Sequence, residues 1–400
     1  MSENNEIKEP LNKNYKVPKL RFPEFYTIYN SQTISSIFKL TGGGTPSTKE
    51  EKYWLGTMPW ISSSDLIEFD INKISETRFI SNEAIENSAT KIVPAFSILV
   101  VTRVGLGKVA VNEHPICTSQ DFTNLYSNNI NPYYFAYLIQ KHLSKKVPQG
   151  STIKGISSKE LAKMNLTYPT KNEQDKIYSF LHILDKKIDV INSKIAILKK
   201  YKEGILFKYK KEANKNGKIL KLASICSLIS GYNFNTNDYI INGNFDIVTI
   251  RNVMDDRYID GDYKHVNFIP KSYVKLSKGD LLISMTGNVG RCSYVNDNNK
   301  LLNQRLCKFE CEDTNKKFIY MITKTNSFKK RMNILAQGGA QPNLKNNDIL
   351  NYIFFKIEDK LIHKNYVEAF DKTDQLLEQS KCLTKTLKRL KRILLNQLFI

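Results

Sequence analysis

Two long segments of the chain place their apolar residues at alternating intervals of three and four. In the first, residues 172–206, the apolar positions are 177, 181, 184, 188, 191, 195, 198 and 205. This heptad spacing predicts a helix that buries a narrow seam against another helix. Pro169 precedes this helix, and Asn172 is its predicted N-cap. The second segment, residues 361–395, keeps the spacing less regularly, through Tyr366, Phe370, Thr373, Leu377, Thr384, Leu387 and Leu394.

At 1.5 Å per residue, each segment would extend for about 50 Å, which is too long to be buried inside one globular domain. A heptad helix also needs a partner, because an isolated helix is marginal in water. We therefore predict that the two helices pair with each other in antiparallel orientation. The alternatives are that each helix packs on its own domain or forms a homodimer.

The two segments are copies of each other, about 189 residues apart. They align without a gap, and the identical pairs are Asp185 with Asp374, Leu198 with Leu387, Lys199 with Lys388, Lys202 with Lys391, and Leu206 with Leu395. The regions before them share three landmarks in the same order: a glycine turn (102–112; 286–296), a polar segment (118–122; 302–306) and a QG segment (149–156; 337–344). This order predicts two copies of a globular domain followed by a long helix.

Within the globular parts the hydrophobic pattern is mixed. Residues 34–40 and 133–146 have helical spacing, whereas 58–62 and 97–102 are short, apolar and β-branched, as in strands. The predicted fold class is α+β: two tandem mixed α/β domains and a pair of long antiparallel coiled-coil helices, related as a pseudo-two-fold repeat. The predicted boundaries are a disordered lead (1–14), the first domain (15–170), the first helix (171–212), the second domain (213–358) and the second helix (359–400).

Charge favours a polyanionic partner. Sixty Lys and Arg against 39 Asp and Glu give a formal net charge of +21, and such an excess attracts nucleic acid. An AT-rich genome would also enrich Lys, Asn and Ile without any functional demand. The hydrophobic fraction of 41% excludes a disordered chain.

Cysteine and histidine usage argues against a metal site. The six cysteines form no C-x-x-C pair and the five histidines are isolated. We therefore expect a reduced, cytoplasmic protein with buried thiols. The polar start lacks an apolar signal segment, and no apolar run approaches the ~18 residues of a membrane span.

Two fragments imitate catalytic motifs. NPYY (131–134) is similar to the Asn-Pro-Pro-aromatic motif of adenine methyltransferases, but Tyr133 replaces the second proline. Residues 97–108 look like a strand entering a glycine loop, yet the third glycine of a dinucleotide site is missing. We predict a binding protein with no catalytic and no metal-binding residue. A DNA adenine methyltransferase with its own active site, and a coiled-coil homodimeric interaction protein, remain the alternatives.

In order and duplication, the local sequences resemble one family, the specificity (S) subunits of type I restriction–modification enzymes. The resemblance covers nearly the whole chain and is carried by VPKLRFPEF (17–25), LTGGGTPST (40–48), WISSSDL (60–66), PAFSILVVTRVGLGKVAV (94–111), QGSTIKGISSKELAKMNLTYP (149–169) and EQDKIYSFLHILDKKID (173–189). The second copy departs from the first, with GYNFN (231–235) where the first has GGGTP.

The resemblance implies a sequence-specific recognition and assembly subunit. Each globular domain would be a target-recognition domain that reads one half of a bipartite site in double-stranded DNA, and the helices would set the unread spacer. The helices would dock two methyltransferase (modification) subunits, and restriction subunits would join as ATP-dependent translocase and nuclease. The cofactors S-adenosylmethionine, ATP and Mg²⁺ would then lie on the partner subunits and none on this chain.

Polar residues in the glycine-flanked loops are the candidate DNA contacts. Arg and Lys suit guanine and phosphate, and Asn and Gln suit adenine. The candidates of the first domain are Thr45, Ser62, Ser63, Arg103, Lys108, Gln120 and Lys154; those of the second are Arg251, Asn252, Asn288, Arg291, Gln304, Arg305 and Asn343. Gln120 and Gln304 occupy matching positions, which is also typical of a shared scaffold. The helix lysines, among them Lys202 and Lys391, are either a solvated flank or a phosphate track.

Overall fold

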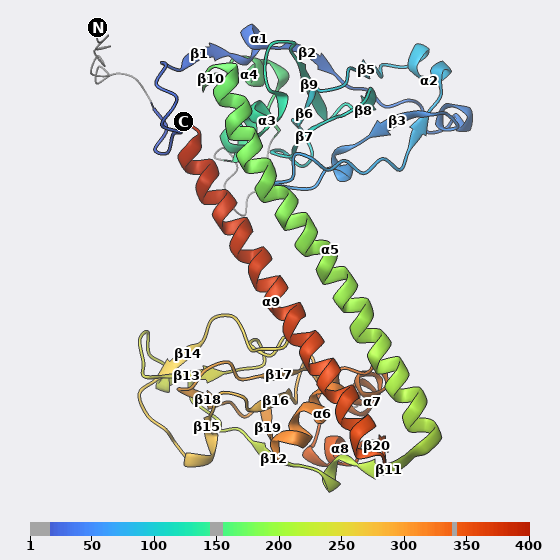
Figure 1. The fold of residues 1–400 in the computed structure, drawn as a ribbon, viewed down its shortest axis with the longest axis vertical. Coiled ribbons are helices and arrows are strands. Elements are labelled where there is room, and N and C mark those ends of the chain that lie inside the picture. The colour runs from blue at the N-terminus through green and yellow to red at the C-terminus, as the bar shows by residue number, and fades with distance from the viewer. Residues whose placement is uncertain (1–16, 145–154, 338–341) are drawn as a thin grey trace, which may run out of the picture. The chain divides into compact units, whose positions relative to one another are not determined.

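The computed structural model describes residues 17–144, 155–337 and 342–400 (Figure 1). The predicted lead 1–14 and the candidate Lys154 lie outside these residues. The chain forms two compact units: residues 1–188 with 386–400, and residues 189–385. Each unit contains one globular domain together with a part of each long helix.

The globular part of unit 1 consists of two four-stranded sheets, one two-stranded sheet and short helices. Its strands are β1 (Asn30–Thr33), β2 (Lys39–Gly42), β3 (Met58–Ile61), β4 (Phe79–Ile80), β5 (Ile92–Val93), β6 (Ile98–Val101), β7 (Val109–Val111), β8 (Ile116–Thr118), β9 (Phe122–Tyr126) and β10 (Asn165–Tyr168). Its helices are α1 (Ile34–Ile37), α2 (Asn82–Glu86), α3 (Pro132–Ser144) and α4 (Ser158–Ala162). The sheet orders are β1-β10, β2-β9-β6-β7 and β4-β3-β8-β5.

The strands predicted at 58–62 and 97–102 are confirmed as β3 and β6, and the helix predicted at 133–146 as α3. The helix predicted over 34–40 is wrong beyond Ile37. Residues 39–42 pair with β9 as an antiparallel strand, with Lys39 opposite Tyr126. A long-range strand pairing overrides the local helical spacing there.

The strands of unit 2 follow the same order as those of unit 1, whereas the helices between them differ in part. Its strands are β11 (Gly217–Lys221), β12 (Ser227–Ser230), β13 (Phe245–Val248), β14 (Lys264–Val266), β15 (Lys275–Leu276), β16 (Leu281–Ser284), β17 (Cys292–Tyr294), β18 (Lys300–Leu302), β19 (Leu306–Glu310) and β20 (Ile353–Ile357). Its helices are α6 (Asp313–Thr323), α7 (Asn326–Ala336) and α8 (Asn346–Leu350).

The sheet orders of unit 2 are β11-β20, β12-β19-β16-β17 and β14-β13-β18-β15. They reproduce those of unit 1 strand by strand, with β1 corresponding to β11 and so on to β10 and β20. In both units the parallel pair lies at the same place, β3 with β8 and β13 with β18. The predicted internal repeat is therefore confirmed at the level of topology.

The two long helices are α5 (Lys171–Asn216) and α9 (Lys360–Leu398), each an uninterrupted run in Figure 1. Every predicted seam position of α5 is buried or half-buried. The predicted N-cap at Asn172 is wrong, because the helix already begins at Lys171. The carbonyl of Thr170 accepts the N–H of Gln174, which places Thr170 at the cap.

In unit 2 the helices run antiparallel. Lys202 of α5 pairs with Asp374 of α9. Further along α5, Tyr209 packs against Tyr366, which comes earlier in α9, with ring centroids 5.6 Å apart. Asp374 also accepts hydrogen bonds from Tyr320 (2.8 Å) and Arg257 (3.3 Å). Burial opposes its charge, but these cations and the hydroxyl hold the pKa of Asp374 below its usual range.

Unit 1 contains the counterpart of this cluster. Asp185 of α5 pairs with Lys391 of α9 (2.6 Å) and accepts hydrogen bonds from Tyr137 and Asn72. The two aspartates, the two lysines and the tyrosines Tyr137 and Tyr320 correspond between the copies. We call these two clusters the helix nodes. Lys202 and Lys391 are therefore held in ion pairs inside the protein, which excludes them from a phosphate track in this conformation.

The lead-in segment before β1 is fastened to the start of α5. The Arg21 guanidinium donates to both carboxylate oxygens of Glu173 (2.9 and 2.8 Å), and Tyr29 donates to the same carboxylate (2.9 Å). Glu173 is fully buried. At the other end, the Lys141 ammonium donates to the carbonyl of Phe399 (2.6 Å), which anchors the end of α9 in unit 1.

Candidate nucleic-acid interface

In unit 1, the loops that follow β2, β3, β6 and β8 are joined by backbone hydrogen bonds. Gly44 donates to Thr118 (2.8 Å), and Ser119 donates to Ile61 (2.8 Å). The N–H of Thr102 donates to the carbonyl of Asp121 (2.8 Å). Residues 42–45, 62–65, 102–108 and 119–121 thus form one surface, which we call the first loop frame.

In unit 2, the corresponding loops are joined by the same bonds. Tyr232 donates to Leu302 (2.9 Å), Asn303 to Val248 (3.2 Å) and Met285 to Arg305 (3.0 Å). We call residues 231–232, 249–252, 285–291 and 303–305 the second loop frame. In each frame a further segment makes an equivalent backbone hydrogen bond. Ile156 donates to the carbonyl of Thr102, and Leu344 donates to that of Met285, both at 2.8 Å.

A shared glycine allows this close approach. A Cβ on Gly43 would lie 2.2 Å from the carbonyl oxygen of Ser119, and one on Gly231 would lie 2.1 Å from that of Asn303. Ser119 and Asn303 are equivalent residues of the two frames. The sequences GGGTP and GYNFN therefore share one required glycine, Gly43 in the first and Gly231 in the second, and differ around it.

The structure places every described candidate of the first domain, which leaves out only Lys154, in the first loop frame. Thr45 donates to the side chain of exposed Gln120. The Lys108 ammonium donates to the carbonyl of Ser63 (2.9 Å), which turns this cation back onto the frame. Exposed Arg103 forms no side-chain hydrogen bond or ion pair within the described part of the chain.

Ser62 has a structural role in this frame. Its N–H donates to the Asp65 carboxylate (2.7 Å), and its hydroxyl accepts from Arg78 (2.8 Å). Arg78 also pairs with Asp65 and stacks over the Trp60 ring, with its guanidinium carbon 4.7 Å from the ring centroid. Asp65 and Arg78 were not among the predicted residues, although Ser62 and Asp65 have the spacing of a capping box.

Most candidates of the second domain lie in or beside the second loop frame. Asn288 and Asn343 are exposed, and Asn343 forms a β-bridge with Thr286 in the loop between β16 and β17. Arg291 is half-buried, with its N–H bound to the Ser284 hydroxyl (3.0 Å). The exposed side chains of Arg251, Gln304 and Arg305 form no hydrogen bond or ion pair with other described residues. They remain predicted DNA contacts.

Asn252 differs from the other candidates because it is only 1% exposed. Its carbonyl oxygen accepts from the N–H (2.9 Å) and hydroxyl (3.0 Å) of Thr249, and its NH₂ donates to the carbonyls of Asp260 (3.2 Å) and Asp262 (3.0 Å). The amide has no donor or acceptor left for a base in this conformation. Asn252 occupies the place of Asp65 in the first frame, and both cap the turn after their strand.

The residues that imitate catalytic motifs have structural roles. The Asn131 side chain accepts the N–H of Tyr134 (2.9 Å) and donates to Asp175 (2.7 Å), so its amide caps α3 and ties it to α5. Tyr133 stacks on Tyr178 with centroids 4.7 Å apart. The glycine loop 102–108 connects the antiparallel strands β6 and β7. It does not lead into a helix, as a dinucleotide-binding loop does.

Comparison with known proteins decides the family. The profile of the type I restriction modification DNA specificity domain matches twice, over residues 29–200 and 214–381. The chain belongs to this family. Its role in a type I restriction–modification system is that of the specificity subunit, which recognises DNA, as the sequence landmarks predicted.

Individual relatives agree with this assignment. The chain is 26% identical over 359 residues to the type I restriction enzyme MjaIX specificity subunit of Methanocaldococcus jannaschii, covering 81% of this chain and 82% of the relative. It is 33% identical over 172 residues to the EcoR124I/EcoR124II specificity subunit of Escherichia coli, covering 40% and 41%. The crystal structure of the S subunit from M. genitalium has the same fold, with a TM-score of 0.69, 17% identity and coverage of 96% and 99%.

The described residues contain no group of three or more His, Cys, Asp or Glu side chains that could hold a metal ion. In the same residues no helix is long and apolar enough to span a bilayer. Burial raises the pKa of the Cys117 thiol to about 11 and that of Cys292 to about 12. These two cysteines are therefore protonated packing residues at neutral pH.

Proposed function

We propose that each loop frame of this specificity subunit contacts one half of a bipartite site in double-stranded DNA. The observation that carries the proposal is the repetition of one backbone frame with different exposed side chains. If the two domains only held the helices in place, their exposed loop side chains would have no need to differ. The formal charge of +21 favours association with DNA. The guanidiniums of Arg103, Arg251 and Arg305, which pair with no described residue, suit phosphates and guanine.

The chain itself is proposed to be non-catalytic and to act in the cytoplasm. Methylation with S-adenosylmethionine would occur on two modification subunits. ATP- and Mg²⁺-dependent translocation and cleavage would occur on restriction subunits. The use of Asn131 as a helix cap supports this division of labour, because the residue best suited to hold a flipped base is already bound to its own chain.

A second apolar stripe on α5 supports docking of the modification subunits. Ile183, Val190 and Ile197 follow one another at heptad intervals, so they share one face of the helix. Their exposed fractions are 68%, 69% and 66%, in contrast to the buried seam that faces α9. An exposed apolar stripe of this kind marks a protein–protein interaction site.

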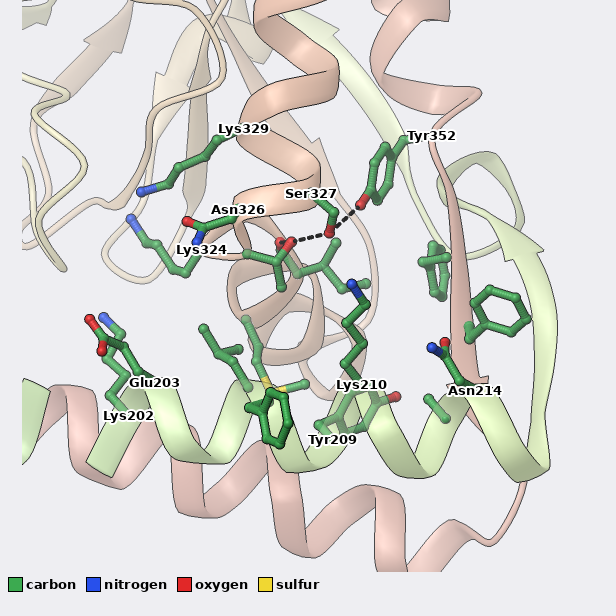
Figure 2. A pocket seen from close by; sticks show the side chains of 18 of the residues that line it. Lys202, Glu203, Tyr209, Lys210, Asn214, Lys324, Asn326, Ser327, Lys329 and Tyr352 are labelled. Carbon is green, nitrogen blue, oxygen red and sulfur yellow. Dashed lines mark hydrogen bonds between the residues drawn. The ribbon is translucent and has the colours of Figure 1, made fainter. Parts of the chain in front are cut away.

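The same helix borders a pocket of about 790 Å³ in unit 2 (Figure 2). Lys210 projects from α5 into the pocket, opposite Ser327 and Tyr352, which are linked by a 3.3 Å hydrogen bond. Phe207, 70% exposed, adds apolar surface to its lining.

Genome-wide mapping of adenine methylation by single-molecule sequencing tests the proposal. A host with an active modification subunit from the same system is compared with and without this chain. We expect a new split motif, two short half-sites around a fixed unread spacer, only when the chain is present. No new motif with the native modification subunit would contradict the proposal.

Three measurements address the alternatives. Replacing Asn131 and Tyr134 would abolish methylation at the reacting step if this chain carried the active site, whereas we expect at most a loss of fold stability. The mass of the pure chain distinguishes a homodimer from a monomer. DNA affinity should fall steeply with added salt if the loop frames contact phosphates.

A further inference from the structure

One position of the loop frames carries opposite charge in the two copies. The residue after the shared glutamine is Asp121 in the first frame and Arg305 in the second. The carbonyls of both residues accept the equivalent backbone hydrogen bond, from Thr102 (2.8 Å) and from Met285 (3.0 Å). The two side chains therefore leave the same backbone scaffold at the same place.

Neither side chain is needed to form its turn. The N–H of Asp121 donates to the Ser119 hydroxyl (3.4 Å), and the N–H of Arg305 donates to the Asn303 side chain (3.2 Å). The residue two places earlier thus supplies the turn contact in both frames. The side chains at 121 and 305 are left available for another role.

Both side chains keep hydrogen-bonding capacity for a ligand. The guanidinium of exposed Arg305 forms no hydrogen bond or ion pair with the described residues. The Asp121 carboxylate has one long contact, 3.5 Å from the Ser119 hydroxyl, and forms no ion pair with the described residues. An unpaired carboxylate on a DNA-facing surface is repelled by phosphates. It is favourable there only if it accepts a hydrogen bond from a base.

The chemistry of base edges gives these two groups complementary targets. Arginine donates two parallel hydrogen bonds to O6 and N7 of guanine, and aspartate accepts one from the N4 amino group of cytosine. Given the proposed function, on which this inference rests, we propose that this position reads one G·C pair in each half-site. Arg305 reads the pair through its guanine, and Asp121 reads it through its cytosine.

Amide substitutions test the inference in the assembled enzyme. Asn and Gln donate to and accept from adenine, so Asp121→Asn and Arg305→Gln should each shift one position of one half-site from G·C toward A·T. Loss of the matched contact should reduce the preference for G·C at that position by about tenfold to a hundredfold. The other half-site and the spacer should not change. Methylated motifs and methylation rates are read by single-molecule sequencing, with each variant supplied to the same modification subunit.

Two matched controls lie at the ends of β7 and β16 that face away from the loop frames. Lys278→Ala removes an exposed charge before β16, and Glu113→Ala removes one after β7. Both should leave the motif unchanged. Asp121→Ala and Arg305→Ala, which remove the charged groups without adding an amide, should relax the position rather than shift it.

The outcomes separate this inference from the proposed function. No split motif with the wild-type chain contradicts the proposed function itself. A wild-type split motif that lacks a G·C pair in either half-site overturns the inference alone. The inference is also overturned if Asp121→Asn and Arg305→Gln keep the wild-type motif at the wild-type rate.

Discussion

The loop frames and the helix nodes are both duplicated, but different parts of the chain are kept in each. In the loop frames the backbone hydrogen bonds are repeated, whereas the exposed side chains differ, as Asp121 and Arg305 do. In the helix nodes the side chains themselves are repeated: an aspartate, a tyrosine and a lysine in each unit. The side chains shared by the two helix nodes therefore stabilise the fold. The side chains that differ between the two loop frames are not needed for the shared backbone and are available for recognition.

The largest expected effect comes from breaking a helix node. Asp374→Ala leaves the buried cations Arg257 and Lys202 with fewer partners, and losing one member of such a buried network costs about 3–5 kcal/mol. Chemical denaturation should show this as a lower free energy of unfolding. Glu368→Ala, on the exposed side of the same helix, is the control and should cost about 0.5 kcal/mol or less. Equal losses of unfolding free energy in the two variants would show that the helix node does not contribute specially to stability.

Adding one methyl group to a frame glycine should have the next largest effect. Gly231→Ala places a Cβ against the carbonyl of Asn303, so the second loop frame must open, at a cost of about 2–3 kcal/mol. We expect methylation of the split site to fall together with thermal stability. Gly204→Ala in α5 meets no atom within 4 Å and should be neutral or slightly stabilising. Full methylation by Gly231→Ala would show that the frame tolerates opening.

A smaller effect is expected at the capping residue of the second frame. Asn252→Ala leaves two carbonyls and the Thr249 N–H without their partners, and we expect a loss of about 1–3 kcal/mol. Asn252→Asp keeps the cap found at Asp65 but turns a buried carboxylate oxygen toward the two carbonyls, so it should be no more stable than Asn252→Ala. Thermal unfolding ranks the three proteins. If Asn252→Ala is as stable as the wild type but recognises a different motif, Asn252 reads DNA after all.

The smallest effect concerns pH and one histidine of α9. Burial, and secondarily the charge of Lys356, lower the pKa of His363 from 6.5 to about 4. Between these values the unfolded chain binds more protons than the folded one, so stability falls as the pH drops from about 6.5 toward 4. His363→Gln should flatten this part of the stability curve for unfolding followed at several pH values. An unchanged slope would assign the acid sensitivity to other groups.

Several features of this protein could be predicted from sequence patterns. The heptad spacing of residues 172–206 defined the seam of α5, because helix periodicity is a property of neighbouring residues. The duplicated landmarks defined the repeat and the family, and the strands at 58–62 and 97–102 followed from short β-branched runs. The predicted domain boundaries remain predictions, and contacts assign parts of both long helices to each unit.

Other features depended on contacts between distant residues. The helix predicted over 34–40 gave way to pairing with β9, and polar Asn252, chosen as a base contact, is buried as a cap. Alignment showed that Asp185 matches Asp374 and that Lys202 matches Lys391, but not that each aspartate pairs with the lysine of the other helix. The sequence by itself determined which residues the two copies share. Only the tertiary structure decided which of them meet, because hydrogen bonds and ion pairs join groups that are far apart along the chain.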